Sequence, residues 1–499
     1  MKSGRRNIPR RNVLRLIGYV ALAVSLGNAA AEADEPGQAW RPVTTVFHVH
    51  SDMSTGSDSL ESLVAQARSY GIEAIILTDN FLLRFEYGLL PLPGLIRWTV
   101  TLPSVMSSGV VRYLEAIRET NQRHPDVLLV PGVEVVPHYY WTGSLFGKDL
   151  TMHDAQKNIL VVGLPSETDY KQLPVAGSYA AYEYGWLTVL WLSPVLLVAP
   201  AIWLLNRRAE RKVSVGLGVL FLIVAGLLLF NNYPFGRPPF DIYQDGNGLQ
   251  PYQRLIEYVR ERGGLTVWSM PQVNDSHRYS FGRLGIVTAK TDPYPDALSL
   301  TRDYTAFGAL YEEAITMTDP GSVWDAVLGD YIRGHRSSPI WGVGEDAYHG
   351  SGHAGKQLFD VETILWAKER TPGALLDAMA KGRMYALLRS KEYGLVLNEF
   401  AVLSEATGEP AVSGQTVRAP ALTPVVVRLA VSSDDGRSHQ TPVQVIRSGR
   451  LMKTGTESVP FTLTVRDTAP AAGELAYYRL MIGTGGNRIV SNPIFIRGE

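Results

Sequence analysis

Two uncharged runs near the middle of the chain constrain its fold more than any other feature. Trp186–Leu205 contains no charged residue, and Val213–Phe230 repeats this after a basic loop, Arg207–Lys212. About 20 apolar residues, each rising 1.5 Å along a helix, are enough to cross the hydrocarbon core of a bilayer. The runs predict a transmembrane helical hairpin over residues 185–234, with a buried core hairpin as the alternative. The positive-inside rule places the basic loop in the cytoplasm, so both flanking segments would face outward.

The N-terminal segment predicts export. A basic stretch precedes an apolar core, Leu16–Gly27, and Ala31–Ala33 offers a small-residue cleavage site, so residues 1–34 form an export signal or an N-terminal anchor. Arg10–Arg15 also resembles a twin-arginine signal, with an ordinary secretory signal as the alternative. We therefore expect the chain at the cell inner membrane, with its catalytic domain on the periplasmic, extracytoplasmic side.

Apolar strands alternate with helices on both sides of the hairpin. Strands are predicted at 45–50, 73–78, 127–130, 158–162, 265–268 and 339–343, and helices at 59–70, 110–123, 252–262, 322–331 and 371–381. Continuous apolar strands that alternate with helices favour an α/β fold with a parallel sheet or barrel. We therefore interpret the hairpin as an insertion into one α/β domain, whose two parts are residues 40–184 and 240–392.

The composition changes after about Tyr393. Short segments rich in Val, Thr and Tyr, separated by Gly, Asp and Ser turns, run through residues 393–499 without helical periodicity. We predict a small all-β sandwich there. It contains no group of residues that suggests chemistry.

Composition limits the chemistry. The chain has 499 residues, enough for about three domains, and its formal net charge of −1 gives no indication of a nucleic-acid partner. The absence of cysteine excludes disulfides, thiolate metal ligands and a cysteine nucleophile. Any metal site must therefore be built from His, Asp and Glu, and ten histidines are available.

The sequence His48-Val49-His50 follows an apolar run and ends a predicted strand. Because residues i and i+2 of a strand point to the same face, both imidazoles should leave the same side. Two neutral imidazoles are what a divalent transition metal needs from its first two ligands. Two unrelated histidines at the end of a strand are the alternative.

Further acidic and histidine residues stand at the ends of other predicted strands. They are Asp79, Glu134, Asp346 and His349. In α/β barrels the carboxyl ends of the strands form the rim where sites are assembled. Carboxylates beside two histidines make a mixed nitrogen and oxygen site that suits Mn, Fe or Zn. Such a divalent metal lowers the pKa of bound water and stabilises charge on a phosphoryl oxygen.

These residues lie in motifs that resemble those of the PHP (polymerase and histidinol phosphatase) superfamily. The motifs are His48-Val49-His50-Ser51, Leu77-Thr78-Asp79, Pro131-Gly132-Val133-Glu134 and Gly344–His349; Ala374–Gly382 resembles the closing segment of the domain, and Ser491-Asn492-Pro493-Ile494 the end of a β-domain often appended to it. The resemblance covers about residues 44–165 and 240–499. It implies a distorted (β/α)7 barrel, a cluster of up to three metals and hydrolysis of phosphate esters.

The sequence departs from the family pattern at several metal-binding positions. Thr55, Asn80, Asn158 and Met270 stand where the family usually has Asp or His, and the closing Asp-x-His is stretched over Asp346–His349. A methionine thioether is a poor ligand for hard or borderline divalent ions. The departures therefore argue against a full cluster of metals.

The residues that survive are those the family groups around one of its metals. They are His48, His50, Glu134 and Asp346. We therefore predict one bound metal, with a second if His349 and either His138 or His153 contribute. Asp79 and His349 are the predicted acid and base candidates.

The predicted function is a membrane-anchored, outward-facing, metal-dependent phosphoesterase whose substrate is a small-molecule or lipid phosphate ester. The alternative is a catalytically degenerate PHP-like module that binds or senses a ligand or partner at the membrane. A hydrolase needs its ligands to hold a metal with an open position, whereas a binding module does not. The apolar segment Leu89–Val105, broken by prolines, is predicted either to rest on the membrane surface or to form a core loop.

Overall fold

The computed structural model describes residues 40–207, 211–313 and 315–499. The predicted export signal, residues 1–34, and part of the basic loop between the two uncharged runs lie outside the described residues. Contacts divide the chain into Met1–Ala39 and Trp40–Glu499, and the second unit contains every element below.

Strands follow one another around the site in a continuous order. They are β1 (Arg41–Val49), β2 (Ala74–Leu77) with its extension β3 (Asp79–Asn80), β6 (Leu128–Val130) with its extension β7 (Gly132–Val135), β10 (Ile159–Val162), β11 (Leu265–Trp268), β14 (Ala306–Leu310) and β15 (Trp341–Gly344). Each pairs with the next in that order. The segment after β15 then returns to β1 through a bridge between Val49 and Tyr348.

One strand of this order, β10, runs opposite to its neighbours. It is antiparallel to both β7 and β11, whereas the other pairs around the site are parallel. A parallel connection needs a crossover, usually a helix, and residues 136–158 contain only two short strands. The expectation of a parallel sheet is therefore wrong at this strand.

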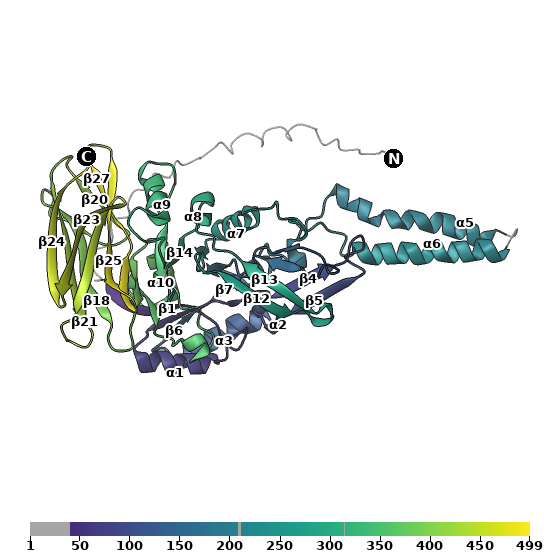
Figure 1. Ribbon diagram of the computed structural model, residues 1–499, viewed down its shortest axis with the longest axis horizontal. Coiled ribbons are helices and arrows are strands. Elements are labelled where there is room, and N and C mark those ends of the chain that lie inside the picture. Colours follow the sequence, from purple (N-terminus) through teal and green to yellow (C-terminus); the bar gives the residue numbers. More distant parts are fainter. Residues whose placement is uncertain (1–39, 208–210, 314) are drawn as a thin grey trace, which may run out of the picture. The chain divides into compact units, whose positions relative to one another are not determined.

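Helices accompany these strands largely as expected (Figure 1). They are α1 (Leu60–Tyr70), α2 (Val105–Ser108), α3 (Val110–Arg123), α4 (Glu167–Lys171), α7 (Gln250–Glu261), α8 (Ala297–Leu300), α9 (Val323–Ile332) and α10 (Pro372–Ala380). The Ser59 side chain caps α1 by accepting from Ser62 N, and Gly71 ends the helix with φ 72°. The apolar stripe of α1, which includes Leu63 and Val64, is buried in the main core.

A smaller sheet, which the sequence analysis did not predict, has its own hydrophobic core. Its order is β12 (Asp275–Ser280), β13 (Ile286–Thr291), β9 (Thr151–His153) and β8 (Tyr140–Thr142), and the separate pair β4 (Arg84–Gly88) and β5 (Arg97–Thr101) contributes to the same core. Phe85, Trp141 and Phe281 are buried there. β12 is mostly exposed and polar, and β8 and β9 have only three residues each, so these strands carry no apolar alternation that marks them in the sequence.

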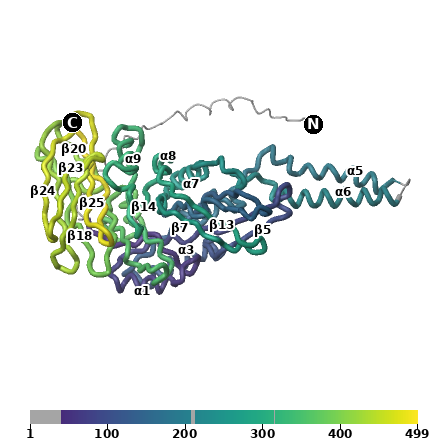
Figure 2. Tube along the Cα trace, viewed as in Figure 1, coloured from purple at the N-terminus to yellow at the C-terminus, as the bar shows by residue number. Residues whose placement is uncertain are grey.

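The two uncharged runs form a helical hairpin (Figures 1 and 2). A 3-10 segment, Trp186–Leu197, leads into α5 (Val198–Asn206), and α6 (Arg211–Asn232) runs back beside it. Trp186–Asn206 and Lys212–Asn232 each span 21 residues, with mean hydropathies of 2.1 and 2.8, and only 11% and 17% of their most apolar windows are buried. By length and composition alone, both are able to cross a membrane. The hairpin leaves and re-enters the domain at one point, where the backbones of Glu183 and Arg237 form an isolated antiparallel β-bridge.

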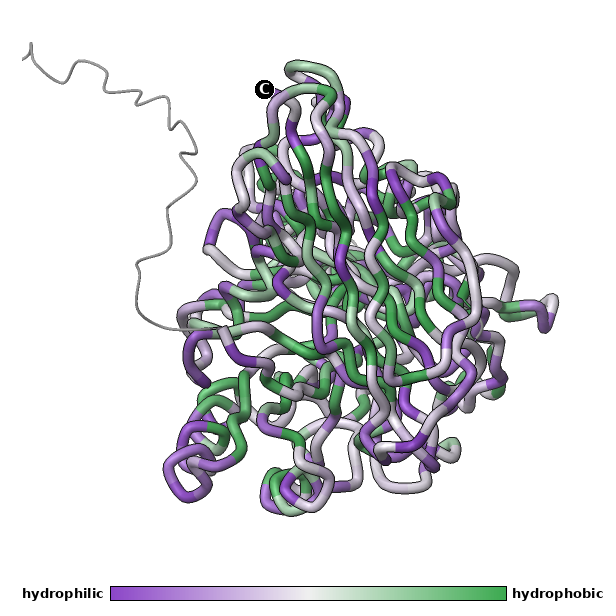
Figure 3. Tube along the Cα trace, turned by 90° about the vertical axis from the view of Figure 1, so that its left-hand side faces the viewer, coloured by the Kyte–Doolittle hydropathy of each residue, from purple (hydrophilic) through white to green (hydrophobic). Residues whose placement is uncertain are grey.

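The C-terminal region is rich in β-structure and is built from two sheets. One has the order β19-β18-β21-β24, and the other has the order β20-β27-β25-β26, with β22 and β23 beside β25. The bounds are β18 (Leu395–Ser404), β19 (Pro410–Ala411), β20 (Thr416–Ala419), β21 (Pro424–Ser433), β22 (Gln440–Arg447), β23 (Arg450–Ser458), β24 (Phe461–Thr468), β25 (Leu475–Thr484), β26 (Asn487–Ser491) and β27 (Ile494–Gly498). Hydrophobic and hydrophilic residues alternate along these strands (Figure 3), because one face of each sheet covers a shared core.

One sheet of this region continues into the strands around the site. β26 pairs with β17 (Met384–Leu388), which pairs with β16 (Val361–Ala367) and through it with β1. Part of the region expected to be a sandwich over residues 393–499 therefore shares a hydrogen-bonded sheet with the strand that carries His48.

Candidate metal centre

His48 occupies a bulge near the end of β1. The pairing of β1 with β2 shifts register between Phe47 and Val49, and His48 has φ 69°, which is uncommon for a residue other than glycine. The simple alternation expected from His48 to His50 is therefore interrupted. The bulge re-aims His48, and both imidazoles still meet in one buried group, with ring centroids 5.2 Å apart. Strain of this kind is concentrated at functional sites.

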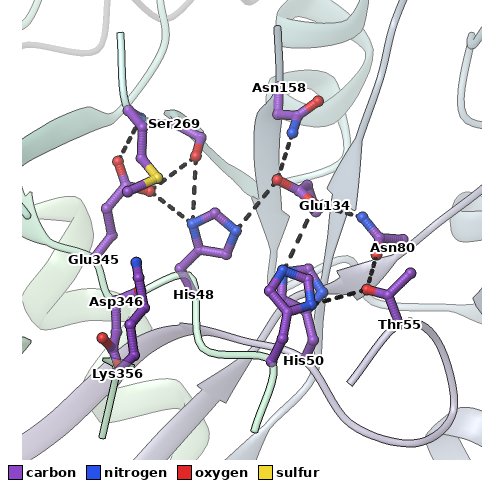
Figure 4. A network of polar contacts seen from close by, with 12 residues as sticks. His48, His50, Thr55, Asn80, Glu134, Asn158, Ser269, Glu345, Asp346 and Lys356 are labelled. Carbon is purple, nitrogen blue, oxygen red and sulfur yellow. Dashed lines mark hydrogen bonds and ion pairs between the residues drawn. The ribbon is translucent and has the colours of Figure 1, made fainter. Parts of the chain in front are cut away.

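His48, His50 and Glu134 form the candidate metal centre (Figure 4). One ligand atom of each lies within 4.8 Å of the others, and all three residues are buried. His48 Nε2 is 3.2 Å from Glu134 Oε1, and His50 Nε2 is 3.7 Å from Glu134 Oε2. Two imidazole nitrogens and a carboxylate oxygen are a donor set that suits Zn, Mn or Fe.

The ring of His50 shows that this group fits a metal. Neither of its nitrogens has a hydrogen-bond partner among the described residues, although the side chain is fully buried. Burial, and then the neighbouring His349 and His48, lower the pKa of His50 well below its ordinary value, so the ring is neutral. A buried polar ring without partners is unfavourable. A divalent metal would satisfy its free lone pair.

Glu345 orients His48 from the other side. Its Oε2 lies 2.9 Å from His48 Nδ1 and accepts from Ser269 Oγ at 3.0 Å, while its Oε1 accepts from Met270 N at 2.5 Å. Burial would lower the pKa of His48, but contacts with Glu134 and Glu345 raise that pKa to about 9. Glu345 engages Nδ1 and leaves Nε2 on the side of Glu134. In many metal-binding histidines a carboxylate likewise holds the ring nitrogen that does not bind the metal.

Sequence reasoning missed Glu345. It stands directly before Asp346 in the motif after β15, and the family resemblance drew attention to Asp346 instead. The available signal was the pair of adjacent acids after an apolar strand. Successive residues at a strand end point to opposite sides, so Glu345 and Asp346 were not expected to face the histidines together.

Two amides hold Glu134. Asn158 Nδ2 donates to Oε1 at 2.5 Å, and Asn80 Nδ2 donates to Oε2. Thr55 Oγ1 in turn donates to Asn80 Oδ1 at 2.6 Å (Figure 4). Thr55, Asn80 and Asn158 stand where the family usually has metal-binding Asp or His. In this chain Asn80 and Asn158 hold the Glu134 carboxylate in place, and Thr55 holds Asn80.

His349 and Asp346, the other predicted ligands, are not part of the group within 4.8 Å. His349 stacks on His50, with ring centroids 4.0 Å apart, and its Nδ1 is 3.1 Å from Thr55 Oγ1. Burial lowers the pKa of His349 to about 4. Asp346 lies beside Lys356, whose Nζ donates to the Asp346 backbone oxygen at 2.6 Å. Both carboxylate oxygens of Asp346 are buried without a hydrogen-bond partner among the described residues.

Asp79, a predicted acid or base, holds the loop after β1. Its Oδ1 accepts from Ser51 N at 2.8 Å and from Ser54 Oγ at 2.5 Å, and its Oδ2 accepts from Ser51 Oγ at 2.9 Å. Burial raises the pKa of Asp79, although these hydrogen bonds lower it. Asp79 does not line the cavity at the metal centre. Its contacts fit a positioning role for the loop that carries His50.

His138 and His153 do not join the candidate ligands. His153 Nε2 contacts Thr142 Oγ1 at 2.7 Å, and its ring stacks on Tyr140 within the small sheet. His138 Nε2 accepts from Asn247 Nδ2 at 3.2 Å. Among the described residues, neither belongs to a group that could hold a metal. Both lie after β7, in the segment that forms the unpredicted small sheet instead of returning to the site.

The metal centre opens onto a cavity of about 340 Å³. His48, Glu134, His349 and Met270 line it together with Asp275, His277 and Tyr279 of β12. Its size lies in the range of small-molecule sites. The β12 residues could not be assigned to the site from the sequence, because no motif marks that strand.

Comparisons with known proteins identify one family for the first part of the chain. The family model of the PHP domain matches residues 47–183. A search of the curated proteins found no match.

Solved structures with some similarity to the chain include two bacterial proteins. One is a two-domain protein containing a predicted PHP-like metal-dependent phosphoesterase from Bacteroides vulgatus; it has 10% identity and a TM-score of 0.35, and 92% of this chain and 99% of that chain are covered. The other is an amidohydrolase from Chromobacterium violaceum, with 14% identity and a TM-score of 0.26, covering 62% of this chain and 88% of that chain. His48, His50 and Glu134 all lie inside the segment that the family model matches, and this chain therefore carries a PHP domain at residues 47–183.

Proposed function

We propose that the chain is a metal-dependent hydrolase of phosphate esters that works with a reduced, single-metal PHP site. The observation that carries this proposal is the buried group of His48, His50 and Glu134, in which neither ring nitrogen of His50 has a hydrogen-bond partner among the described residues. The PHP domain match supports the reaction class.

His48, His50 and Glu134 would hold a divalent metal, either Mn, Zn or Fe. When bound, such a metal lowers the pKa of a water molecule and stabilises charge on the phosphoryl group. The residues around the ligands fix their orientation before substrate arrives. Glu345 directs His48, and the amides of Asn80 and Asn158 hold Glu134, so little reorganisation would be needed in the transition state.

His349 is the proposed group for proton transfer. It lines the cavity, and its lowered pKa keeps the ring neutral, so it can accept a proton from an attacking water. Nδ1 of His349 is engaged with Thr55 Oγ1 at 3.1 Å, which leaves Nε2 for this task. Asp79 would act indirectly, by holding the loop that carries His50.

We also propose that the strands around the site form a distorted (β/α)7 barrel, which the hairpin interrupts. The bridge from Val49 to Tyr348 supports closure between the segment after β15 and β1. So do the hydrogen bonds from His50 N to Tyr348 O, at 2.8 Å, and from Tyr348 N to His48 O, at 3.0 Å. The same contacts tie both histidines to the end of the last strand.

The hairpin at residues 185–234 is proposed to anchor the protein in the cell inner membrane, with the PHP domain on the periplasmic side. The support is the uncovered apolar surface of its helices and the basic loop Arg207–Lys212 between them. The substrate would be a small-molecule or lipid phosphate ester. A reporter fused within the basic loop should report a cytoplasmic position. Activity of a reporter that works only in the periplasm would overturn this orientation.

A PHP-like binding or sensory module is the second proposal. The observation that favours it is the pair of amides, Asn80 and Asn158, that engage both oxygens of Glu134. Met270 also replaces a usual ligand and lines the cavity. In that case the cavity would recognise a ligand without hydrolysing it.

Metal content and turnover distinguish the two proposals. We expect the full chain, purified in detergent and reconstituted with Mn, Zn or Fe in turn, to hold about one metal per chain. The His48→Ala/His50→Ala variant should lose this metal, whereas the control His335→Ala/His439→Ala, altered far from the ligands in sequence, should keep it. Hydrolysis of bis(p-nitrophenyl) phosphate or p-nitrophenyl phosphate that depends on the metal supports the hydrolase. A bound metal without turnover favours the binding module, and no metal contradicts the single-metal site.

A further inference from the structure

A second cavity, of about 450 Å³, lies at the base of the apolar hairpin. No residue lines both this cavity and the one at the metal centre. Its walls come from both ends of the hairpin, from the loop between β4 and β5, and from the segment around His138. The proposed phosphoesterase reaction makes no use of it.

We propose that this cavity binds the phosphate headgroup of an anionic phospholipid from the surrounding bilayer. The proposal rests on the membrane insertion proposed above and is independent of the metal. The lipid would be held beside the hairpin, with its headgroup in the cavity and its acyl chains along the helices.

The position of the cavity along the hairpin matches the headgroup level of a bilayer. Trp191 of the first apolar run and Asn231 and Asn232 at the end of α6 line it, so it begins where the apolar surface ends. Asn231 Oδ1 accepts from Gly94 N at 3.0 Å and from Leu95 N at 3.1 Å. These hydrogen bonds attach the β4–β5 loop to the C-terminal end of α6. The apolar helices have almost no protein cover, and lipid is the solvent that such a surface requires.

Two arginines give the cavity a preference for anions. Arg237 forms no ion pair among the described residues, and its side chain is exposed at the cavity wall. Arg97 Nη1 lies 3.4 Å from Glu86 Oε2, while Arg84 engages the other oxygen of that carboxylate at 2.5 Å. Asp241 is the other carboxylate on the wall, and it accepts from a backbone N–H. The cationic side chains are therefore only partly neutralised, as a phosphate-binding site requires.

His138 adds a hydrogen-bond donor without an acceptor. Its Nε2 lies 3.2 Å from Asn247 Nδ2. An amide nitrogen donates and does not accept, so Nε2 is the acceptor in this contact. Burial lowers the pKa of His138 to about 4, so the ring is neutral and carries its proton on Nδ1. Nδ1 has no partner among the described residues. His138 therefore places a buried, unpaired donor in the cavity wall.

The rim of the cavity favours a lipid over a soluble phosphate. Leu90 and Tyr233 line the cavity and are 65% and 63% exposed, and Trp191 beside them is 38% exposed. Exposed aromatic and aliphatic side chains around a polar pocket are typical of the membrane interface. A free phosphate would leave this rim uncovered, whereas acyl chains would cover it.

The test is lipid binding to the full chain in a neutral detergent, followed by native mass spectrometry. The probes are dioctanoyl phosphatidylglycerol, dioctanoyl phosphatidylcholine and glycerol phosphate. We expect phosphatidylglycerol to bind and the other two to bind at least about tenfold more weakly, since a charge-assisted contact is worth roughly a factor of ten. The Arg97→Gln/Arg237→Gln variant should lose about tenfold in phosphatidylglycerol affinity, and the control Arg418→Gln/Arg466→Gln, on exposed C-terminal strands, should not.

Two additional variants make the result decisive. Arg237→Gln alone removes a side chain that has no ion pair to lose, so a folding defect is not expected, and its affinity should still fall about threefold. The His48→Ala/His50→Ala variant should bind phosphatidylglycerol like wild type, which separates this proposal from the metal-dependent function. Equal binding of all three probes, equally tight binding of glycerol phosphate, or unchanged affinity in both arginine variants would overturn the lipid site. Release of the chain from membranes into the soluble fraction by alkaline carbonate would instead overturn the proposed membrane insertion, whatever the metal content.

Discussion

The candidate metal centre and the seam between the strands around the site and the C-terminal region differ in how their buried polar groups are paired. At the seam, Arg479 of β25 pairs with Asp325 of α9 at 2.6 Å, and both side chains are almost fully buried. Tyr477 OH also donates to Asp325 at 2.7 Å. Asn492 Oδ1 accepts from Gly342 N of β15 at 2.7 Å, and its Nδ2 donates to Gly342 O at 2.9 Å. Here polar groups from distant parts of the chain pair with one another, although Arg479 Nη1 has no hydrogen bond among the described residues.

At the candidate metal centre, and at Asp346 outside the ligand group, buried polar atoms lack hydrogen bonds among the described residues. Both ring nitrogens of His50 and both carboxylate oxygens of Asp346 lack hydrogen bonds among the described residues. Buried polar groups normally find partners, because leaving one unpaired costs about 1–3 kcal/mol. We infer that the buried polar groups of the seam stabilise the fold, whereas the unpaired groups at the candidate metal centre are available to the proposed metal. Four predictions test this comparison.

The largest expected effect is at the seam. Arg479→Met should lower the free energy of unfolding by about 3–5 kcal/mol, because it leaves the Asp325 carboxylate buried without its cation. Denaturant unfolding followed by tryptophan fluorescence measures this, with Arg466→Met, whose side chain is 81% exposed, as the matched control. The folded variant should keep the metal stoichiometry of the wild type. A loss of less than 1 kcal/mol would show that the seam does not depend on this pair.

The next effect is on metal affinity. Glu345→Gln keeps the shape of the side chain but weakens its hold on His48 Nδ1, so affinity for the metal should fall about 10- to 100-fold. Equilibrium dialysis with Zn or Mn measures the change, and Glu474→Gln, an exposed glutamate of the C-terminal region, is the control. An unchanged affinity would mean that His48 is oriented without Glu345.

A third change should stabilise the metal-free protein. Asp346→Asn removes a buried carboxylate whose pKa burial raises well above its ordinary range, and it should increase the free energy of unfolding by roughly 1–3 kcal/mol at pH 7. Thermal unfolding of the metal-free variant beside the wild type checks this. If Asp346 also binds the metal, the gain should disappear in the metal-loaded protein. Destabilisation of the metal-free variant would contradict the view that this carboxylate lacks a partner.

The last effect, similar in size to that of Asp346→Asn but confined to high pH, is a pH dependence at the edge of the seam. Burial raises the pKa of Glu362 on β16 to about 7, and Arg389, 3.9 Å away, only partly opposes this. The folded protein therefore binds this proton more tightly than the unfolded chain. The contribution of Glu362 to stability is complete below about pH 4.5 and is lost as the pH rises to about 7.

Glu362→Gln should remove this dependence. The variant should match the wild type at pH 4 and exceed its free energy of unfolding by roughly 1–3 kcal/mol at pH 8. Unfolding curves across this range, recorded on both proteins, provide the measurement. An equal difference at both pH values would show that the carboxyl group does not titrate with a raised pKa.

Local patterns were sufficient to find the main parts of the site. The strand ending in His48 and His50 and the strand carrying Glu134 were both recognisable from apolar runs followed by ligand-type residues. The caps of α1 are local as well, since Ser59 and Gly71 stand directly before and after the helix. The two uncharged runs likewise determined a helical hairpin from their own composition.

The strands of the small sheet and the reversal of β10 were not predictable in this way. β12 is polar and exposed, and its partner β13 pairs with β9, more than a hundred residues earlier in the chain. The direction of β10 depends on how the chain returns after β7, which periodicity within the strand does not report.

The sequence by itself determined which residues end the strands, which runs are apolar enough to span a membrane, and which side chains are suited to a metal. Only the tertiary structure decided which of them meet. Glu345 and His48 are 297 positions apart and lie 2.9 Å from each other, whereas Asp346, the neighbour of Glu345, lies outside the candidate ligand group. The physical reason is that periodicity reports the local backbone and burial, while the partner of a buried polar group is set by the packing of strands that the sequence keeps far apart.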